Sequence, residues 1–498
     1  MTGPDPTLFA LDHLAVRGTA EADALIVGDA RLTYCELDNA VGTTASALLS
    51  KGLVPGDRVA TWMGKTMLAC IMPLAAARAG LIHVPINPVL KHSQAAHILS
   101  DSGAKLLIAN SARLESLERG DLADAKAIAL EAWREGKTCL PPSNRDPDEL
   151  AALLYTSGST GRPKGVMLSH ANLWLGAISV AHYLGLRPDD RTLCVLPLAF
   201  DYGQNQLLST WAAGGCAIGF DYLLPRDVVR AVQRHDVTVI AGVPPLWLQL
   251  AEQKWGEAGG SLRNLTNSGG HLPETLVRRL RTQFPQAKLH LMYGLTEAFR
   301  SSSLDPALID EHPDSIGTDI PFAELMVVRT DGSEAASGEE GELVHAGPLV
   351  AHGYWNDPTR TAERFRPAPP FSKHGGTAVW SGDAVVKGED GLFRFRGRDD
   401  AMIKVSGNRI SPTEIEEAAL ASGAVADAVA FGVPDARLGQ AIVLVAVAKQ
   451  DEAEKRLSEW LRRELPQHMQ PQRIIWKDRL PVGPNGKLDR TALKAELA

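Results

Sequence analysis

The chain has 498 residues, of which 45% are hydrophobic and 22% charged, and its formal net charge is −8 at pH 7. This length predicts more than one domain, because single hydrophobic cores stop growing well below it. The negative charge and the lack of a long basic run argue against nucleic acid or an anionic membrane as the main partner. No window approaches the roughly 20 apolar residues that span a bilayer, and no secretory signal opens the chain. Five scattered cysteines indicate reduced, mostly buried thiols, so we expect a cytoplasmic protein without a membrane span.

Strand-like and helix-like stretches alternate through the first quarter of the chain. Apolar spacing predicts helices over residues 37–49 and 67–79, and strands over residues 57–61, 82–86 and 105–109. Such alternation predicts a layered α/β architecture in which most strands pair in parallel.

A glycine-rich stretch, Tyr155–Gly165, follows an apolar run over residues 150–154 that is typical of a buried strand. Its glycines allow close approach of backbone N–H groups to a phosphate, and Arg162 and Lys164 add positive charge. The spacing is not that of a Walker loop. The alternative is a mobile linker, but such linkers seldom lie between two apolar strands. The stretch therefore predicts a phosphate-binding loop, with a second strand and a helix N-cap at Ser169 after it.

The middle of the chain repeats the alternation of strands and helices. We expect helices over residues 173–186 and 273–284 and strands over residues 193–197, 237–240, 265–266 and 289–293. Ligands in such sheets bind beyond the carboxyl ends of the strands. Gly269–Gly270 and Gly294–Glu297 follow two of these predicted strands.

The pattern changes after residue 320. Short strands with turns predict a β-rich subdomain over residues 320–396, and a boundary follows at residues 397–400. Beyond it we expect a separate unit with strands over residues 425–433 and 441–447 and an amphipathic helix around Trp460. Its first helix is predicted from Ser411 as N-cap and Glu414 completing a capping box.

The glycine-rich loop resembles the phosphate-binding signature of the adenylate-forming superfamily, which includes acyl-CoA synthetases, luciferases and the adenylation domains of peptide synthetases. Four further motifs of that family follow at Tyr293–Ala298, Trp380–Asp383, Lys404–Glu414 and Pro484–Arg490. The resemblance covers nearly the whole chain. It implies a large N-terminal adenylation domain and a small, mobile α+β C-terminal domain, which we place at residues 1–399 and 400–498.

The resemblance also implies roles for single residues. Tyr293 lies against adenine, Thr296 contacts phosphate, Glu297 helps to hold Mg²⁺, and Asp383 accepts hydrogen bonds from the ribose hydroxyls beside Arg398. Taken alone, the Gly-x-Thr-Glu and Ser-Gly-Asp patterns are usually turns. The complete set of expected nucleotide-binding residues is Thr156, Ser157, Gly158, Ser159, Thr160, Gly161, Lys164, Gly269, Gly270, Tyr293, Gly294, Asp383 and Arg398.

The C-terminal motifs imply two half-reactions in one site. Lys487 resembles the mobile lysine that reaches the forming acyl phosphate, which makes it a catalytic residue together with Thr296 and Glu297. The family usually has a threonine shortly before this lysine, whereas this chain has Val482-Gly483-Pro484. Asp400 matches the hinge position. The segment containing Lys404 and Gly407 resembles the loop that faces the site when the thiol reacts.

Three residues suggest the acid that is activated. Asp201, in Phe-Asp-Tyr-Gly, resembles the aspartate that pairs with the substrate ammonium in amino-acid-activating domains; the alternative is a helix cap. Arg300 suits a second substrate carboxylate, and the alternative is an ion pair with a pocket acid, even Asp201 itself. Ser268 is positioned to add a hydrogen bond. Together they suggest an amino acid or amino dicarboxylate.

The same region looks like acyl-CoA ligases associated with exosortase A systems and like stand-alone ligases that load amino acids onto carrier proteins. We therefore expect an AMP-forming acid–thiol ligase that uses ATP and Mg²⁺ and transfers the acyl group to CoA or to the phosphopantetheine of a separate carrier protein. One alternative is an ordinary acyl-CoA synthetase for a fatty or other acid that lacks an amine. Another is a catalytically silent relative that binds nucleotide and serves as a partner protein.

Overall fold

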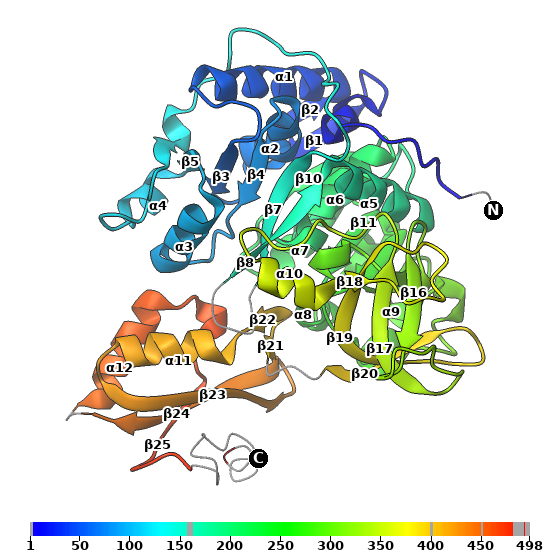
Figure 1. Ribbon diagram of the computed structural model, residues 1–498. Helices are drawn as coiled ribbons and strands as arrows, with labels where there is room; N and C mark the ends of the chain where they lie inside the picture. Colours follow the sequence, from blue (N-terminus) through cyan, green and yellow to red (C-terminus); the bar gives the residue numbers. More distant parts are fainter. Residues whose placement is uncertain (1–2, 157–162, 399–401, 450–451, 482–492, 494–498) are drawn as a thin grey trace. The chain divides into compact units, whose positions relative to one another are not determined.

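The computed structural model describes residues 3–156, 163–398, 402–449 and 452–481 together with Leu493 (Figure 1). Contacts within the chain divide it into two compact units. The first consists of Met1–Pro88, Ile98–Thr156 and Gly165–Asp399, and the second of Val89–His97, Ser157–Lys164 and Asp400–Ala498. The assignment of residues 1–399 and 400–498 to two functional domains stays a prediction.

The largest sheet of the first unit is built from strands that lie far apart in the sequence. Its strands are β1 (Asp23–Val27), β2 (Ala30–Thr33), β9 (Arg191–Cys194), β10 (Cys216–Gly219), β11 (Val239–Gly242), β12 (Asn264–Asn267), β13 (Lys288–Tyr293), β14 (Ser302–Ser303), β15 (Ser315–Asp319), β16 (Glu324–Val328), β17 (Glu340–Ala346), β18 (Phe365–Pro367), β19 (Thr377–Lys387) and β20 (Phe393–Arg398). The central strands β1, β10, β9, β11, β12 and β13 are neighbours in this order and pair in parallel. Strands β15 to β20 pair antiparallel, which is the β-rich pattern predicted for residues 320–396.

A second sheet of the same unit carries the strands around the glycine-rich loop. It contains β3 (Arg58–Trp62), β4 (Ile82–Pro85), β5 (Leu106–Ala109), β6 (Lys126–Ala129), β7 (Leu150–Thr156) and β8 (Lys164–Ser169). Their order is β6-β5-β3-β4-β7-β8, and the pairs among β3, β4, β5, β6 and β7 are parallel. The predicted α/β class with mostly parallel pairing is therefore confirmed for the core of the unit.

The α-helices before residue 398 fall between these strands along the chain. They are α1 (Tyr34–Ser50), α2 (Met67–Arg78), α3 (His92–Ser102), α4 (Ser111–Glu115), α5 (His170–Tyr183), α6 (Asp201–Ala212), α7 (Pro225–His235), α8 (Pro244–Ala251), α9 (Glu274–Gln283) and α10 (Pro358–Arg364). The N-cap predicted at Ser169 is confirmed, because its hydroxyl accepts a hydrogen bond from the backbone N–H of Asn172 and begins α5. Helices α5 and α6 pack against each other, and every residue of α6 is buried.

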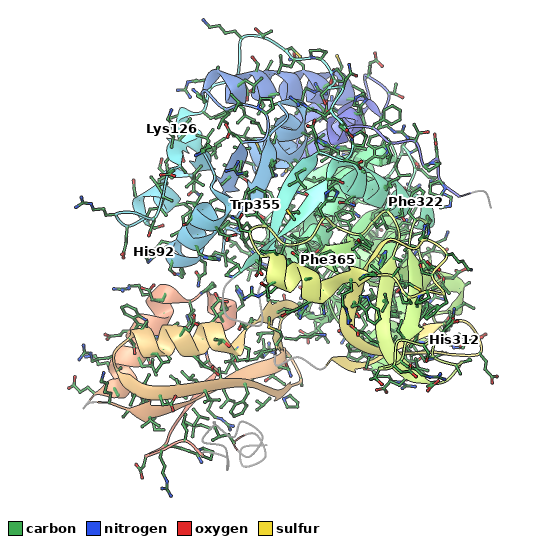
Figure 2. The ribbon with its side chains drawn as sticks, in the orientation of Figure 1. His92, Lys126, His312, Phe322, Trp355 and Phe365 are labelled. Atoms are coloured by element: carbon green, nitrogen blue, oxygen red, sulfur yellow. The ribbon has the colours of Figure 1, made fainter. Side chains whose placement is uncertain are left out.

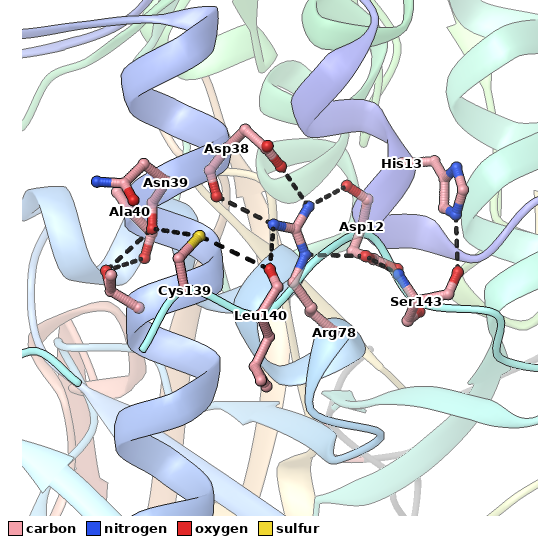
Figure 3. Close-up of polar contacts among 10 residues, drawn as sticks. Asp12, His13, Asp38, Asn39, Ala40, Arg78, Cys139, Leu140 and Ser143 are labelled. Carbon is pink, nitrogen blue, oxygen red and sulfur yellow. Dashed lines mark hydrogen bonds and ion pairs between the residues drawn. The ribbon is translucent and has the colours of Figure 1, made fainter. Parts of the chain in front are cut away.

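A buried arginine fastens the N-terminal segment to the first unit (Figure 3). Arg78, at the end of α2, donates from Nε to Asp12 Oδ2 over 3.0 Å and from Nη1 to the carbonyl oxygen of Asp38 over 3.0 Å. The Arg78 and Asp12 side chains are both fully buried. The Asp12 carboxylate also accepts from the backbone N–H and hydroxyl of Ser143, which lies in the connection before β7. One guanidinium thus joins three distant parts of the chain.

The second unit has its own sheet and hydrophobic core. Its elements are β21 (Ile403–Val405), β22 (Asn408–Ile410), α11 (Pro412–Ala421), β23 (Val425–Asp435), β24 (Gly439–Ala448), α12 (Ala453–Glu464) and β25 (Arg473–Trp476). The predicted capping box at Ser411 is wrong. Ser411 precedes α11 as predicted, but its buried hydroxyl makes no hydrogen bond to the first turn of the helix, so the capping box does not form.

Two further expectations concern the chain as a whole. None of the helices within the described ranges is both long and apolar enough to cross a bilayer. All five cysteines are free thiols; Cys70, Cys194 and Cys216 are buried, while Cys35 and Cys139 are exposed.

Candidate active site

The carboxyl ends of the parallel strands bring several predicted site residues together. Asp201 begins α6 on the connection that leaves β9, and Ser268, Gly269 and Gly270 directly follow β12. Tyr293 ends β13, and Gly294 leads into the short 3₁₀ helix η4 (Thr296–Ala298), which contains Thr296 and Glu297. Gly269 has φ of +79°, a conformation that glycine adopts without steric cost. The placement agrees with ligand binding at strand ends in α/β sheets.

A tyrosine and an aspartate connect the parallel sheet with its antiparallel extension. Tyr293 donates a short hydrogen bond from its hydroxyl to Oδ2 of Asp383, which is buried in β19. Asp383 lies opposite Arg398 of β20 in the strand register. The structure therefore brings together three residues that the sequence assigns to the nucleoside part of the nucleotide.

Glu297 is held by a residue that the sequence did not identify. The hydroxyl of Tyr354 donates to Oε1 of Glu297 over 2.6 Å, and the carbonyl oxygen of Glu297 accepts from the N–H of Ala351 over 2.9 Å. Tyr354 in turn packs edge-on against Phe365, which Figure 2 labels, with 5.3 Å between ring centroids. The carboxylate of Glu297 is thus oriented by a tyrosine 57 positions away in the sequence.

Asp201 and Arg300 form a buried ion pair. Arg300 Nη1 lies 2.8 Å from Asp201 Oδ2, and the side chains are 2% and 3% exposed. The hydroxyl of Thr296 donates to the other carboxylate oxygen over 3.2 Å, and the guanidinium lies 4.6 Å from the centre of the Tyr202 ring. This is the alternative that the sequence left open for Arg300. Asp201 is the first residue of α6, and its carboxylate bonds to these side chains.

Burial and the neighbouring polar groups shift the pKa of Asp201 in opposite directions. Loss of solvation raises the pKa of Asp201, and the charge of Arg300 with the hydrogen bonds from Arg300 and Thr296 opposes that rise. The Nε and Nη2 atoms of Arg300 are buried and make no hydrogen bond with the described residues. These donors fit an acceptor supplied by a ligand, because buried guanidinium N–H groups are costly to leave unpaired.

The residues around the glycine-rich loop are described only at its two ends. Thr156 ends β7, and its buried hydroxyl oxygen has no hydrogen-bond partner among the described residues. Lys164 begins β8 and is partly exposed. The other predicted loop residues lie outside the described residues, namely Ser157, Gly158, Ser159, Thr160 and Gly161.

The segment predicted for the thiol step forms a tight hairpin within the second unit. Val405 pairs with Asn408, and the two residues between them, Ser406 and Gly407, have φ of +51° and +81°. Two positive φ angles in a two-residue loop define a type I′ turn, which explains the glycine. Lys404 is exposed, and its backbone N–H donates to Gln440 Oε1 over 2.7 Å. Asp400 and Lys487 lie outside the described residues.

The donor set fits a nucleotide and a hard cation. Asp383 is a buried acceptor for hydroxyl groups, the Thr156 hydroxyl has no partner among the described residues, and Thr296 and Glu297 are consecutive residues that each carry side-chain oxygen. No cluster of three or more metal-ligating side chains occurs in the ranges that the structure describes. Magnesium does not need one, because it binds through one or two carboxylates together with substrate phosphates and water.

Comparison with known proteins identifies the family of the chain. The AMP-binding enzyme family model matches residues 13–355, and the model of the AMP-binding enzyme C-terminal domain matches residues 414–487. A feruloyl-CoA synthase from Amycolatopsis sp. is 34% identical over 95% of both chains. An L-proline–[L-prolyl-carrier protein] ligase from Pseudomonas fluorescens is 30% identical over 94% of both chains.

Solved structures agree with the sequence comparisons. An o-succinylbenzoate CoA synthetase from Bacillus subtilis superposes with a TM-score of 0.87 at 26% identity, over 98% of both chains. ATP-bound MatB from Rhodopseudomonas palustris superposes with a TM-score of 0.72 at 26% identity, over 98% of both chains. The chain therefore belongs to the AMP-binding enzyme family, the adenylate-forming acid–thiol ligases that include acyl-CoA synthetases and amino acid–carrier protein ligases.

Proposed function

We propose that the protein activates an amino acid or an amino dicarboxylate as its acyl-adenylate and then transfers the acyl group to a phosphopantetheine thiol of a carrier protein or CoA. In the first step an oxygen of the acid attacks the α-phosphorus of ATP, the bond to the bridging oxygen breaks, and pyrophosphate leaves. In the second step the thiolate attacks the acyl carbon and AMP leaves. The observation that carries the substrate class is the bonding capacity left at the buried Asp201–Arg300 pair, because Nε and Nη2 of Arg300 have no partner among the described residues.

The pair retains bonding capacity for a zwitterionic ligand. Each carboxylate oxygen of Asp201 has more than one acceptor site, and its two observed partners leave room for a substrate ammonium. Arg300 uses Nη1 for Asp201 and has two further buried nitrogen atoms for a second carboxylate. An ammonium and a carboxylate that bind together keep the pocket neutral, so neither charge is buried alone. Ser268, buried after β12, would add a hydrogen bond.

The remaining roles follow from the described contacts and the family. Asp383, oriented by Tyr293 and flanked by Arg398, would accept hydrogen bonds from the ribose hydroxyls. Thr156, Lys164 and the rest of the glycine-rich loop, with Thr296, would hold the phosphates, and Gly269, Gly270 and Gly294 would allow the nucleotide close approach. Magnesium, bound through Glu297, would neutralise phosphate charge. Lys487 would stabilise the charge that develops during adenylation, and Lys404 and Gly407 would face the site during the thiol step, after a turn at Asp400.

The test is pyrophosphate release across a panel of amino acids, amino dicarboxylates, fatty acids and aromatic acids, followed by mass analysis of thioesters formed with CoA and with phosphopantetheinylated carrier proteins. We expect release with an amine-bearing acid and its loss by more than tenfold in Lys487→Ala. Lys455→Ala, an exposed lysine of α12, is the matched control and should retain activity. Full adenylation by Lys487→Ala with every active acid would contradict the site assignment.

A second candidate is an acyl-CoA synthetase for an acid without an amine. It is favoured by the ion pair itself, because Arg300 already neutralises Asp201, and by the 34% identity with a feruloyl-CoA synthase. Asp201→Asn distinguishes the two candidates. Loss confined to amine-bearing acids supports the first candidate, and equal activity with all acids supports the second.

A further inference from the structure

The chain reverses direction between Glu297 and Arg300 through a strained turn. Phe299 has φ of +58° and ψ of −55°, and the N–H of Arg300 donates to the carbonyl oxygen of Ala298 over 2.6 Å. A hydrogen bond across three residues with a positive central φ is the rare form of γ-turn. For a residue with a bulky side chain this conformation is costly and persists only where the surroundings impose it.

The packing that holds this turn in place involves a glycine in the neighbouring helix α5. The Phe299 ring is fully buried and lies against Gly176, in the interior of α5. A Cβ atom at position 176 would overlap the ring carbons Cδ1 and Cε1 far inside van der Waals contact. Glycine is unfavourable in the middle of a helix, so its presence here needs a reason such as this close approach.

The turn acts on Arg300 more directly than on Glu297. Arg300 Nη1 donates both to the carbonyl oxygen of Phe299 over 3.0 Å and to Asp201 Oδ2 over 2.8 Å. Its guanidinium is therefore tied to the backbone of the turn itself. Glu297 has anchors of its own in Tyr354 and in the N–H of Ala351.

We infer that Phe299 and Gly176 form a positioning pair, in which the ring seated against the glycine fixes the γ-turn and thereby aims Arg300 at Asp201 and the acid. The inference rests on the proposed function in one respect, namely that Arg300 faces the acid. Neither residue of the pair needs to touch substrate. We expect the pair to affect selectivity for the acid rather than the binding of ATP. The residues proposed to bind the nucleotide and its cation, Asp383 and Glu297, are held by other side chains, Tyr293 and Tyr354.

Phe299→Leu is the primary variant, and Phe284→Leu is its matched control. Phe284 is also a buried phenylalanine of the first unit, and it packs edge-on against Trp255. We expect Phe299→Leu to raise the KM for the acid about tenfold while the KM for ATP changes less than twofold. Phe284→Leu should change neither KM. Equal effects of the two variants on both KM values would show that Phe299 contributes only to packing of the hydrophobic core, and would overturn the inference.

The position of the Arg300 side chain can be measured by NMR, independently of enzyme activity. The ¹⁵Nε–H resonance of Arg300 is assigned from its absence in Arg300→Lys and compared in Phe299→Leu, Phe284→Leu and the wild type. A shift and faster hydrogen exchange in Phe299→Leu alone are expected, and an unchanged resonance overturns the inference whatever the substrate is. If the resonance moves but Arg300→Lys leaves acid selectivity unchanged, the positioning holds and the substrate role of Arg300 in the proposed function is wrong.

The double variant tests the contact itself. Gly176→Ala alone should displace the ring and raise the KM for the acid at least as much as Phe299→Leu. In Gly176→Ala with Phe299→Leu the added methyl group enters space that the ring has vacated, so the KM for the acid should be lower than in Gly176→Ala alone. Strictly additive effects of the two substitutions would show that the residues act independently and would contradict the pair.

Discussion

Arg300 and Asp201 are 99 positions apart in the sequence, yet Nη1 of one lies 2.8 Å from Oδ2 of the other in a site where neither side chain is more than 3% exposed. A buried pair of this kind contributes little net stability but is strongly destabilising when one partner is removed. The stability of this part of the first unit therefore depends on both charges.

Asp201→Ala should lower the free energy of unfolding by about 3–5 kcal/mol, because it leaves Arg300 buried without its carboxylate. The double variant Asp201→Leu with Arg300→Met should lose less than Asp201→Ala, since no charge remains buried. Urea denaturation followed by fluorescence measures both. Asp29→Ala, which breaks the exposed pair with Arg234, should cost less than about 1 kcal/mol. A cost for Asp201→Ala as small as that of Asp29→Ala would contradict the prediction.

Tyr293→Phe should raise the KM for ATP about tenfold. The substitution removes the hydroxyl that donates to Asp383. Removing a hydrogen-bond donor from a buried carboxylate costs about 1–3 kcal/mol of free energy. Initial rates of pyrophosphate release at varied ATP provide the measurement. Tyr183→Phe is the control, because its hydroxyl donates to the sulfur of Met292. A similar rise in both variants would show that the effect is not transmitted through Asp383.

Tyr354→Phe should raise the Mg²⁺ concentration required for half-maximal activity. If Glu297 binds Mg²⁺ as proposed, loss of the 2.6 Å hydrogen bond from Tyr354 removes one of the contacts that orient its carboxylate toward the cation. Titration of activity with Mg²⁺ at saturating ATP and acid tests this. Tyr34→Phe, which removes a hydrogen bond to the carbonyl oxygen of Gly215, serves as the control and should leave the Mg²⁺ requirement unchanged. If Tyr354→Phe leaves it unchanged as well, Glu297 does not depend on the tyrosine.

Stability should fall as the pH decreases below about 6.5, the usual pKa of a histidine. Burial lowers the pKa of His83 and His345 to about 3 and that of His170 and His290 to about 4. The unfolded chain therefore binds more protons than the folded chain between about pH 4 and 6.5, and stability is lost as pH falls through this window. Above it these groups contribute no pH dependence.

Each fully titrating histidine adds about 1.4 kcal/mol per pH unit to the slope of unfolding free energy against pH. His345→Asn should reduce the slope by about one proton, because burial lowers the pKa of His345 to about 3. Urea denaturation at pH 5 and pH 8 gives the comparison. A flat dependence of wild-type stability between these values would contradict the prediction.

The parallel core of the fold was predictable because its strands are buried on both faces and appear in the sequence as continuous apolar runs. The hairpin of β1 and β2 was missed: β2 is partly exposed and carries no apolar run, whereas the apolar run of β1 over residues 24–27 could have indicated its strand. The strand expected over residues 193–197 ends at Cys194, before the chain turns through Pro197 toward α6. Local sequence patterns thus predicted the presence of these strands better than their first and last residues.

Short sequence motifs identified the candidate site residues that lie on one stretch of the chain. Tyr293, Glu297 and Asp383 were expected from their motifs, and the structure places Tyr293 against Asp383. Tyr354 was not, because a hydroxyl that reaches a carboxylate 57 positions away leaves no local pattern. Gly176 was visible as a glycine inside a helix, but its partner could not be read from the sequence. The Asp201–Arg300 contact was one of two open alternatives, and only the fold decides between them.

The buried ion pair between Arg78 and Asp12 has a practical consequence for protein engineering. Two carboxylates neutralise this guanidinium: that of Asp38, and the fully buried one of Asp12, which lies within a 3₁₀ helix (Leu11–Val16) close to the start of the chain. Shortening an expression clone by a dozen codons would remove the buried carboxylate and leave Arg78 with Asp38 alone, and we expect the loss of stability to lower the yield. Cloning junctions are better placed ahead of Pro4.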